Sequence, residues 1–149
     1  MEFIEKVKLF NEIAGTKNEF DKRKAALYVG LICEELGELF DSFKSDNFNS
    51  NTMAMNSLSM LFKQGSYDYL FDTVDRVEFI DAVSDITVVA LGAGIAIGAD
   101  ISGACNAVAD NNLEKFPIHN GIHTVLRDAN GKIAKPPNFK SVELSEFVK

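Results

Sequence analysis

The sequence has few of the residues that build disulfide or zinc scaffolds, since its 149 residues include two cysteines, two histidines and no tryptophan. Cys33 and Cys105 are too few and too far apart for a disulfide framework, and neither lies in a CxxC or Cys/His pattern typical of zinc sites. We therefore expect both to be free thiols. Nothing in the sequence pairs either cysteine with a base, so nucleophilic cysteine chemistry is not indicated.

Long apolar runs are also absent. The longest uncharged run, Ile86–Ala99, has 14 residues, fewer than the roughly 20 that a membrane-spanning helix needs. Residues 1–10 alternate charged and apolar side chains and contain no continuous apolar stretch typical of a secretory signal. The sequence therefore predicts a cytoplasmic protein in which residues 86–99 form an interior helix rather than a membrane span.

Basic residues are fewer than acidic ones. The sequence has 15 Lys and Arg and 22 Asp and Glu, which gives a formal net charge of -7. This balance disfavours a nucleic acid polymer or an anionic membrane surface as a partner. A small anionic substrate would need a cation to help it bind. The length is typical of one domain, so we expect a single folding unit over residues 1–149.

Apolar residues recur at helical spacing through most of the chain. Thr16 and Glu19 have the spacing of a capping box, and Pro117 is expected to stop the last long element. The periodicity predicts helices over residues 2–14, from Thr16 to about 44, over 71–97 and over 101–116.

Two further segments differ from these long helices. A methionine-rich, weakly amphipathic stretch that Gly65 ends predicts a helical insert at about residues 45–70. Asn130-Gly131, between short apolar segments, predicts a hairpin or an extended arm within residues 118–149. The expected fold class is therefore all-α, an antiparallel helical bundle with a C-terminal hairpin or arm.

Acidic residues form two stripes on the predicted long helices. Glu34, Glu38 and Asp41 fall at i, i+4 and i+7, and Glu35 lies beside Glu38. Like charges at this spacing repel one another on a helix, which stability alone does not favour, although a solvated acidic face remains the plain structural explanation.

The second stripe, Glu78, Asp81 and Asp85, shares its helix with the apolar run. Two such stripes packed together would supply hard oxygen ligands of the kind that Mg²⁺ or Mn²⁺ prefers. Neither helix contains the Glu-x-x-His of a di-iron bundle, so an oxygen-activating centre is disfavoured.

Four segments together resemble a known family: EELGEL, EFIDAVSDITVVALGAGIAIGAD, NNLEKFP and GKIAKPPNF. They are similar to the all-alpha nucleoside triphosphate pyrophosphohydrolases, the MazG-like and phosphoribosyl-ATP pyrophosphohydrolase-like group, and most of all to its short phage-type members. Glu35 with Glu38 matches the family's ExxE pair, and Glu78 with Asp81 matches its ExxD pair. The 39 residues between Glu38 and Glu78 exceed the usual spacer, and the insert fills the difference.

The resemblance implies hydrolysis of a nucleoside triphosphate between the α and β phosphates, with Mg²⁺, or Mn²⁺, as cofactor. The catalytic candidates are Glu34, Glu35 and Glu38, and Glu34 or Glu35 is the candidate base that activates water. The candidate metal ligands are Glu35, Glu38, Glu78, Asp81 and Asp85.

The resemblance also assigns Asn112 and Lys115 to nucleotide contacts. Lys22, in the basic group Lys22–Lys24, and Lys135, with Lys132 on the tail, are further candidates for contacts to phosphate. Lys115 is equally explained as a solvated lysine at the end of a helix. The alternatives are an activity on phosphoribosyl-ATP and a non-catalytic, metal-binding helical oligomer.

The apolar face of residues 86–99 is larger than one short chain easily covers. A homodimer or a dimer of dimers is therefore expected.

Overall fold

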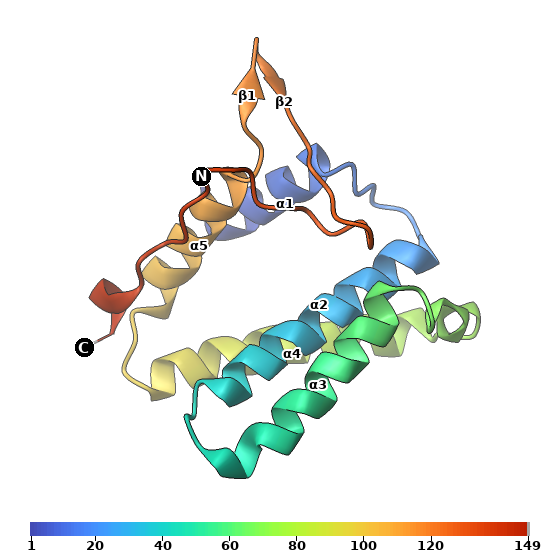
Figure 1. Cartoon of the computed structure of the whole chain (residues 1–149), viewed down its shortest axis with the longest axis vertical. Coiled ribbons are helices and arrows are strands. Elements are labelled where there is room, and N and C mark those ends of the chain that lie inside the picture. The colour runs from blue at the N-terminus through green and yellow to red at the C-terminus, as the bar shows by residue number, and fades with distance from the viewer. Residues whose placement is uncertain (149) are drawn as a thin grey trace. The chain divides into compact units, whose positions relative to one another are not determined.

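The computed structural model describes residues 1–148 and contains, within them, five α-helices and one two-stranded hairpin (Figure 1). The all-α class predicted from periodicity is confirmed. The elements are α1 (Phe3–Ile13), α2 (Lys22–Asp41), α3 (Asn49–Lys63), α4 (Arg76–Ala96), α5 (Ile101–Leu113), β1 (Ile118–His119) and β2 (Ile122–His123), with short 3-10 helices at Asp46–Phe48, Asp68–Asp72 and Ser145–Phe147.

The chain divides into two compact units. The α2–α3 unit comprises residues 18–74 and 127–132, and the α1–α4–α5 unit comprises residues 1–17, 75–126 and 133 onward. Each unit is therefore described by itself.

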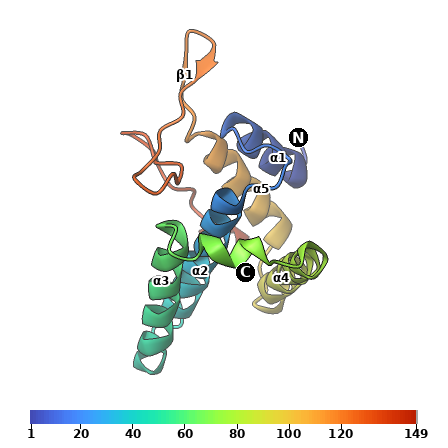
Figure 2. The same ribbon diagram turned by 90° about the vertical axis from the view of Figure 1, so that its right-hand side faces the viewer.

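In the α2–α3 unit the two helices run antiparallel and lie side by side (Figures 1 and 2). Glycines of α2 permit the close approach: a Cβ built on Gly30 would lie 2.7 Å from the Lys63 Cγ and 2.9 Å from the Ser59 carbonyl oxygen. One on Gly37 would lie 2.7 Å from the Asn56 Oδ1. Ser59 is correspondingly buried, with 2% of its surface exposed. The predicted insert is thus the partner helix of α2.

The predicted start of α2 at Thr16 is wrong. Asp21 is the N-cap, and its side chain accepts a hydrogen bond from the Lys24 backbone N–H. Both Thr16 and Asp21 suit a cap by residue type, so tertiary context decided between them. Arg23 is the second residue of α2. Its guanidinium donates to the Phe62 and Lys63 carbonyl oxygens and to the Asp68 carboxylate, 2.6 Å away, and so satisfies the C-terminal end of α3.

In the α1–α4–α5 unit, α1 packs along α5. The rings of Phe10 and Phe116 lie 4.9 Å apart, and Phe116 is almost completely buried. The buried Lys6 ammonium donates to the Asp110 carboxylate at 2.7 Å. A burial of this kind needs its ion pair, because an unpaired ammonium there would be costly. Helix α5 ends at Leu113, three residues before the predicted end, and a turn carries the chain to Phe116.

Helix α4 has no buried residue, so the expectation that it forms an interior helix is not met within one chain. Val88, Val89 and Ile95 are each about two-thirds exposed. The helix packs on α5 at the corner between them, where a Cβ on Gly94 would lie 2.6 Å from the Ile101 Cδ1. In the described residues it is also the one helix whose length and composition would allow it to cross a membrane.

The C-terminal hairpin forms at a different Asn-Gly pair from the predicted one. Strands β1 and β2 pair Ile118 with His123 and flank Asn120-Gly121, which both have positive φ, as a tight two-residue hairpin turn requires. Figure 2 shows the hairpin projecting beyond the end of α5. Asn130-Gly131 also lies in a turn of the C-terminal arm, but single bridge residues, Arg127 and Ile133, flank it in place of strands.

The α2–α3 contact predicts that alanine substitutions at its two glycines will differ in their effect on stability. Gly30→Ala should lower the free energy of unfolding by about 1–3 kcal/mol, because its methyl group meets backbone and a packed side chain. Gly37→Ala is the matched control on the same helix. Its methyl group meets the end of the Asn56 amide, which can rotate, and the better helix propensity of alanine offsets the clash. Urea unfolding of both variants measures the difference, and equal stabilities would contradict the described packing.

Candidate functional site

The acidic segment of α2 lies on the border of its buried face. Ala26, Gly30 and Gly37 line the face that meets α3. Glu34 follows Gly30 by four residues, so it sits at the edge of this contact and is partly buried, whereas Glu35 and Glu38 are exposed. The three catalytic candidates thus share one helix but lie in two different environments.

Two lysines hold the Glu34 carboxylate. The Lys63 ammonium donates to Oε1 at 3.1 Å, and the Lys132 ammonium donates to Oε2 at 2.6 Å. The Glu34 side chain is 24% exposed. Partial burial by itself would raise the pKa of Glu34, but the two ammonium groups outweigh it and hold the pKa below its usual value.

A tight turn delivers Lys132 to Glu34 from 98 residues away. The Asp128 carboxylate accepts from the backbone N–H groups of Asn130 and Lys132, at 2.8 and 3.0 Å, and the Arg127 guanidinium donates to the Gly131 carbonyl oxygen. Asn130-Gly131 therefore has a structural role in the arm, because Gly131 supplies the positive φ of this turn.

The second acidic stripe lies on the first turns of α4. Asp75 is the N-cap and accepts hydrogen bonds from the backbone N–H groups of Val77 and Glu78, at 2.8 and 3.1 Å. Glu78, Asp81 and Asp85 occupy one helix face, as their spacing predicts, and all three are exposed. Among residues 1–148, no three His, Cys, Asp or Glu side chains are grouped closely enough to hold a metal ion.

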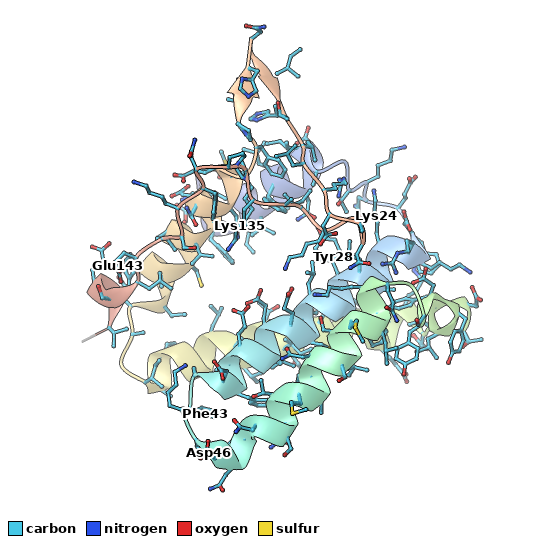
Figure 3. All side chains as sticks on the ribbon, in the orientation of Figure 1. Lys24, Tyr28, Phe43, Asp46, Lys135 and Glu143 are labelled. Atoms are coloured by element: carbon cyan, nitrogen blue, oxygen red, sulfur yellow. The ribbon has the colours of Figure 1, made fainter. Side chains whose placement is uncertain are left out.

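The predicted phosphate contacts fall into both units. In the α2–α3 unit, the half-exposed Lys22 ammonium donates to the Asp72 carboxylate at 2.8 Å, and this hydrogen bond raises the pKa of Lys22. In the α1–α4–α5 unit, the ammonium groups of Lys115 and Lys135 lie 5.8 and 5.6 Å from the centre of the Phe139 ring. Figure 3 labels Lys135 on the C-terminal arm.

Asn112 is partly buried near the end of α5, but its neighbour Asn111 is the residue that holds the arm. The Asn111 side-chain amide donates to the Lys140 carbonyl oxygen at 2.8 Å, and its oxygen accepts from the Val142 backbone N–H at 3.2 Å. Sequence reasoning overlooked both Asn111 and Lys63. No local signal marks these two contacts, because Glu34 lies 29 residues from Lys63 and Lys140 lies 29 residues from Asn111.

The two cysteines are free thiols, as predicted. Burial raises the pKa of both Cys33 and Cys105, so less of the reactive thiolate forms near neutral pH.

Comparison of the chain with protein-family models, with curated proteins and with solved structures finds no match.

The pairing of Glu34 with Lys132 predicts a pH-dependent stability. Lys132→Met should lower the free energy of unfolding at pH 7 by about 1 kcal/mol, since Lys132 is partly exposed to screening solvent. Because the folded-state pKa of Glu34 is lowered, this stabilisation is full above the unfolded pKa of about 4.3. It is lost as the pH falls through the lower folded-state value. The loss caused by the substitution should therefore shrink towards zero in acid.

Urea unfolding of wild type and Lys132→Met at several pH values measures this effect. Lys44→Met is the control, because the Lys44–Asp41 pair is 3.4 Å long and largely exposed, and its loss should cost little at any pH. A Lys132→Met effect independent of pH would contradict the ion pair with Glu34.

Proposed function

We propose that the protein is a Mg²⁺-dependent nucleotide pyrophosphohydrolase, which cleaves a nucleoside or deoxynucleoside triphosphate between the α and β phosphates. The observation that carries the proposal is the pair of carboxylate stripes on two long helices. Glu35 and Glu38 are exposed on α2, and Glu78 and Asp81 are exposed on α4. The spacing within each pair is the one that the family resemblance requires.

Uncovered apolar surface beside each stripe supports a helical bundle as the active form. On α2, several apolar side chains remain exposed, including those of Tyr28, Leu36 and Leu39, at 36%, 38% and 48% (Figure 3 labels Tyr28). On α4, Val88 and Val89 are 67% and 66% exposed. We propose that these faces are covered in an antiparallel bundle, within one chain or between two copies, so that the two carboxylate stripes meet.

The donor set fits the proposed cofactor. The candidate ligands offer carboxylate oxygens and no soft or imidazole ligand, which suits Mg²⁺ or Mn²⁺. Glu35, Glu38, Glu78, Asp81 and Asp85 would hold the ions, which when bound would neutralise triphosphate charge and lower the pKa of a bound water.

The environment of Glu34 favours Glu35 as the base. Two ammonium groups stabilise the ionised form of Glu34, and a carboxylate so stabilised is a weak acceptor of a proton from water. Glu34 is better suited to positioning Lys63 and Lys132 beside the acidic segment. Catalysis would then consist of placing the water and neutralising the phosphates, without a covalent enzyme intermediate.

Release of pyrophosphate tests the proposal. The purified protein should release pyrophosphate and a monophosphate from at least one canonical or modified triphosphate with Mg²⁺ and not with EDTA. Glu38→Gln should reduce turnover at least about 100-fold, because it removes a charged ligand. Glu12→Gln, an exposed glutamate of α1, is the matched control and should leave turnover unchanged.

Product identification by mass separates the alternatives. Cleavage of phosphoribosyl-ATP and of no other nucleotide would change the proposed substrate and leave the proposed pyrophosphohydrolase reaction unchanged. Cation binding without turnover on any substrate would favour a non-catalytic helical oligomer, for which the exposed surface of α4 is the specific support.

The exposed face of α4 predicts a homodimer or a dimer of dimers. Light scattering should give a mass at least twice the chain mass of 16.4 kDa. Val88→Glu, which places a charge on that face, should reduce the mass towards that of one chain. Met53→Glu is the matched control, since Met53 is equally exposed but lies on α3. A monomeric wild type, or a wild type that sediments with phospholipid vesicles, would overturn self-association through α4.

A further inference from the structure

A pocket of about 450 Å³ lies where the end of α5, the hairpin and the C-terminal arm meet. This volume lies within the range of small-molecule sites. Its apolar walls come from Pro117, Pro136, Pro137 and Phe139, and its polar and charged lining residues are Glu114, His119, Asn138 and Lys140. All of these residues belong to the α1–α4–α5 unit. Flat proline and phenylalanine surfaces suit a planar ring.

Two ammonium groups lie over the phenylalanine ring of this pocket, and one acidic and one basic side chain, Glu114 and Lys140, complete its charged lining. The ammonium groups of Lys115 and Lys135 approach the Phe139 ring from α5 and from the arm, and Lys140 also lines the pocket. Phe139 itself is only partly buried. In a protein with a net charge of -7, lysines gathered beside an aromatic ring form a local site for an anion that carries a ring.

Hydrogen bonds hold the arm in this position. Asn111 fixes the backbone at Lys140 and Val142, and the Phe139 backbone N–H donates to the Pro136 carbonyl oxygen at 3.1 Å. The Ala134 N–H donates to the Leu126 carbonyl oxygen at 2.9 Å. The pocket is therefore built by the folded arm before any ligand arrives, which lowers the entropy cost of binding.

We propose that this pocket binds the base of a nucleotide, stacked on Phe139, with Lys115 and Lys135 beside the phosphates. The proposal rests on the proposed function for the identity of the ligand. It adds the place where the base lies and the side chain on which it stacks, which simple polyphosphates could not use. Base–aromatic stacking tolerates different bases, so His119 and Asn138 are the groups available to distinguish base edges.

The absence of tryptophan offers a direct probe. Phe139→Trp gives the full chain a single tryptophan at the proposed site. In EDTA, so that no hydrolysis occurs, the four deoxynucleoside triphosphates should quench its fluorescence, whereas inorganic tripolyphosphate, which has no base, should not. Met53→Trp on α3 is the control and should respond to neither ligand. Quenching of both tryptophans, or of neither, would overturn the proposal.

Phe139→Leu tests the same contact by calorimetry and does not depend on the folding of the tryptophan variant. Its affinity for the best-bound triphosphate should fall about 5- to 100-fold, the range for one lost stack, and its affinity for tripolyphosphate should stay unchanged. Lys135→Gln should weaken the binding of both ligands. An equal loss for both ligands in Phe139→Leu would overturn base stacking.

Pyrophosphate release, measured in parallel with Mg²⁺, keeps the two proposals apart. Activity with an unchanged KM in Phe139→Leu would reject the base site and leave the hydrolase proposal standing. Nucleotide-specific quenching of Phe139→Trp without activity on any triphosphate would support the base site and reject the hydrolase proposal.

Discussion

The close approach of α2 and α3 is the contact on which the environment of the acidic segment depends. Gly30 lets the backbone of α3 come within reach of α2 at Ser59 and Lys63. The stem of the Lys63 side chain lies against Gly30, and its ammonium group reaches Glu34, which is one helical turn further along α2. A larger residue at position 30 would separate the helices and weaken this ion pair together with the packing. Stability and the electrostatics of the candidate site are therefore coupled through one glycine.

The same packing places the glutamates of α2 in different environments. Glu34 is partly buried and held by Lys63 and Lys132, while Glu35 and Glu38 face solvent beside an uncovered apolar surface. The ammonium groups offset the cost of burying a carboxylate and reduce the repulsion within the acidic stripe. In our proposal, divalent cations supply the compensating charge at the exposed glutamates. Under that proposal, part of the net charge of -7 would be a local requirement for cations rather than a property of the whole surface.

Helix α4 carries apolar surface that a single chain leaves uncovered. Its acidic residues occupy the first turns, and its apolar residues continue to its C-terminal end, with none of them buried. Exposed apolar surface of this size in a folded chain generally marks an interaction face. Covering it would remove apolar area from water at about 25 cal/mol per Å². It would also lower the dielectric around Asp85, where carboxylates interact more strongly with a cation. Assembly and metal binding would therefore reinforce each other in the proposed bundle.

Local pattern by itself determined most of the helices, because a helix is built from hydrogen bonds four residues apart and shows its buried face as a repeat in the sequence. It located α1 and α5 closely and predicted α3 as a helix that Gly65 ends. It also put Glu78, Asp81 and Asp85 on one face of α4. It chose the wrong cap for α2, which is Asp21 rather than Thr16. It also overlooked Asn120-Gly121, which joins the paired strands β1 and β2, whereas the predicted Asn130-Gly131 forms a turn between single bridge residues.

The tertiary structure decided the partners of these residues. Three contacts join chain segments that lie far apart in sequence: Lys63 and Lys132 hold Glu34, Asn111 fixes the arm, and the ammonium group of Lys115 lies over the Phe139 ring. Such contacts depend on which helix faces pack and in what register, and neither is encoded in local periodicity. The sequence alone determined which residues carry charge and on which helix face they lie, and the fold alone decided which of those charges meet.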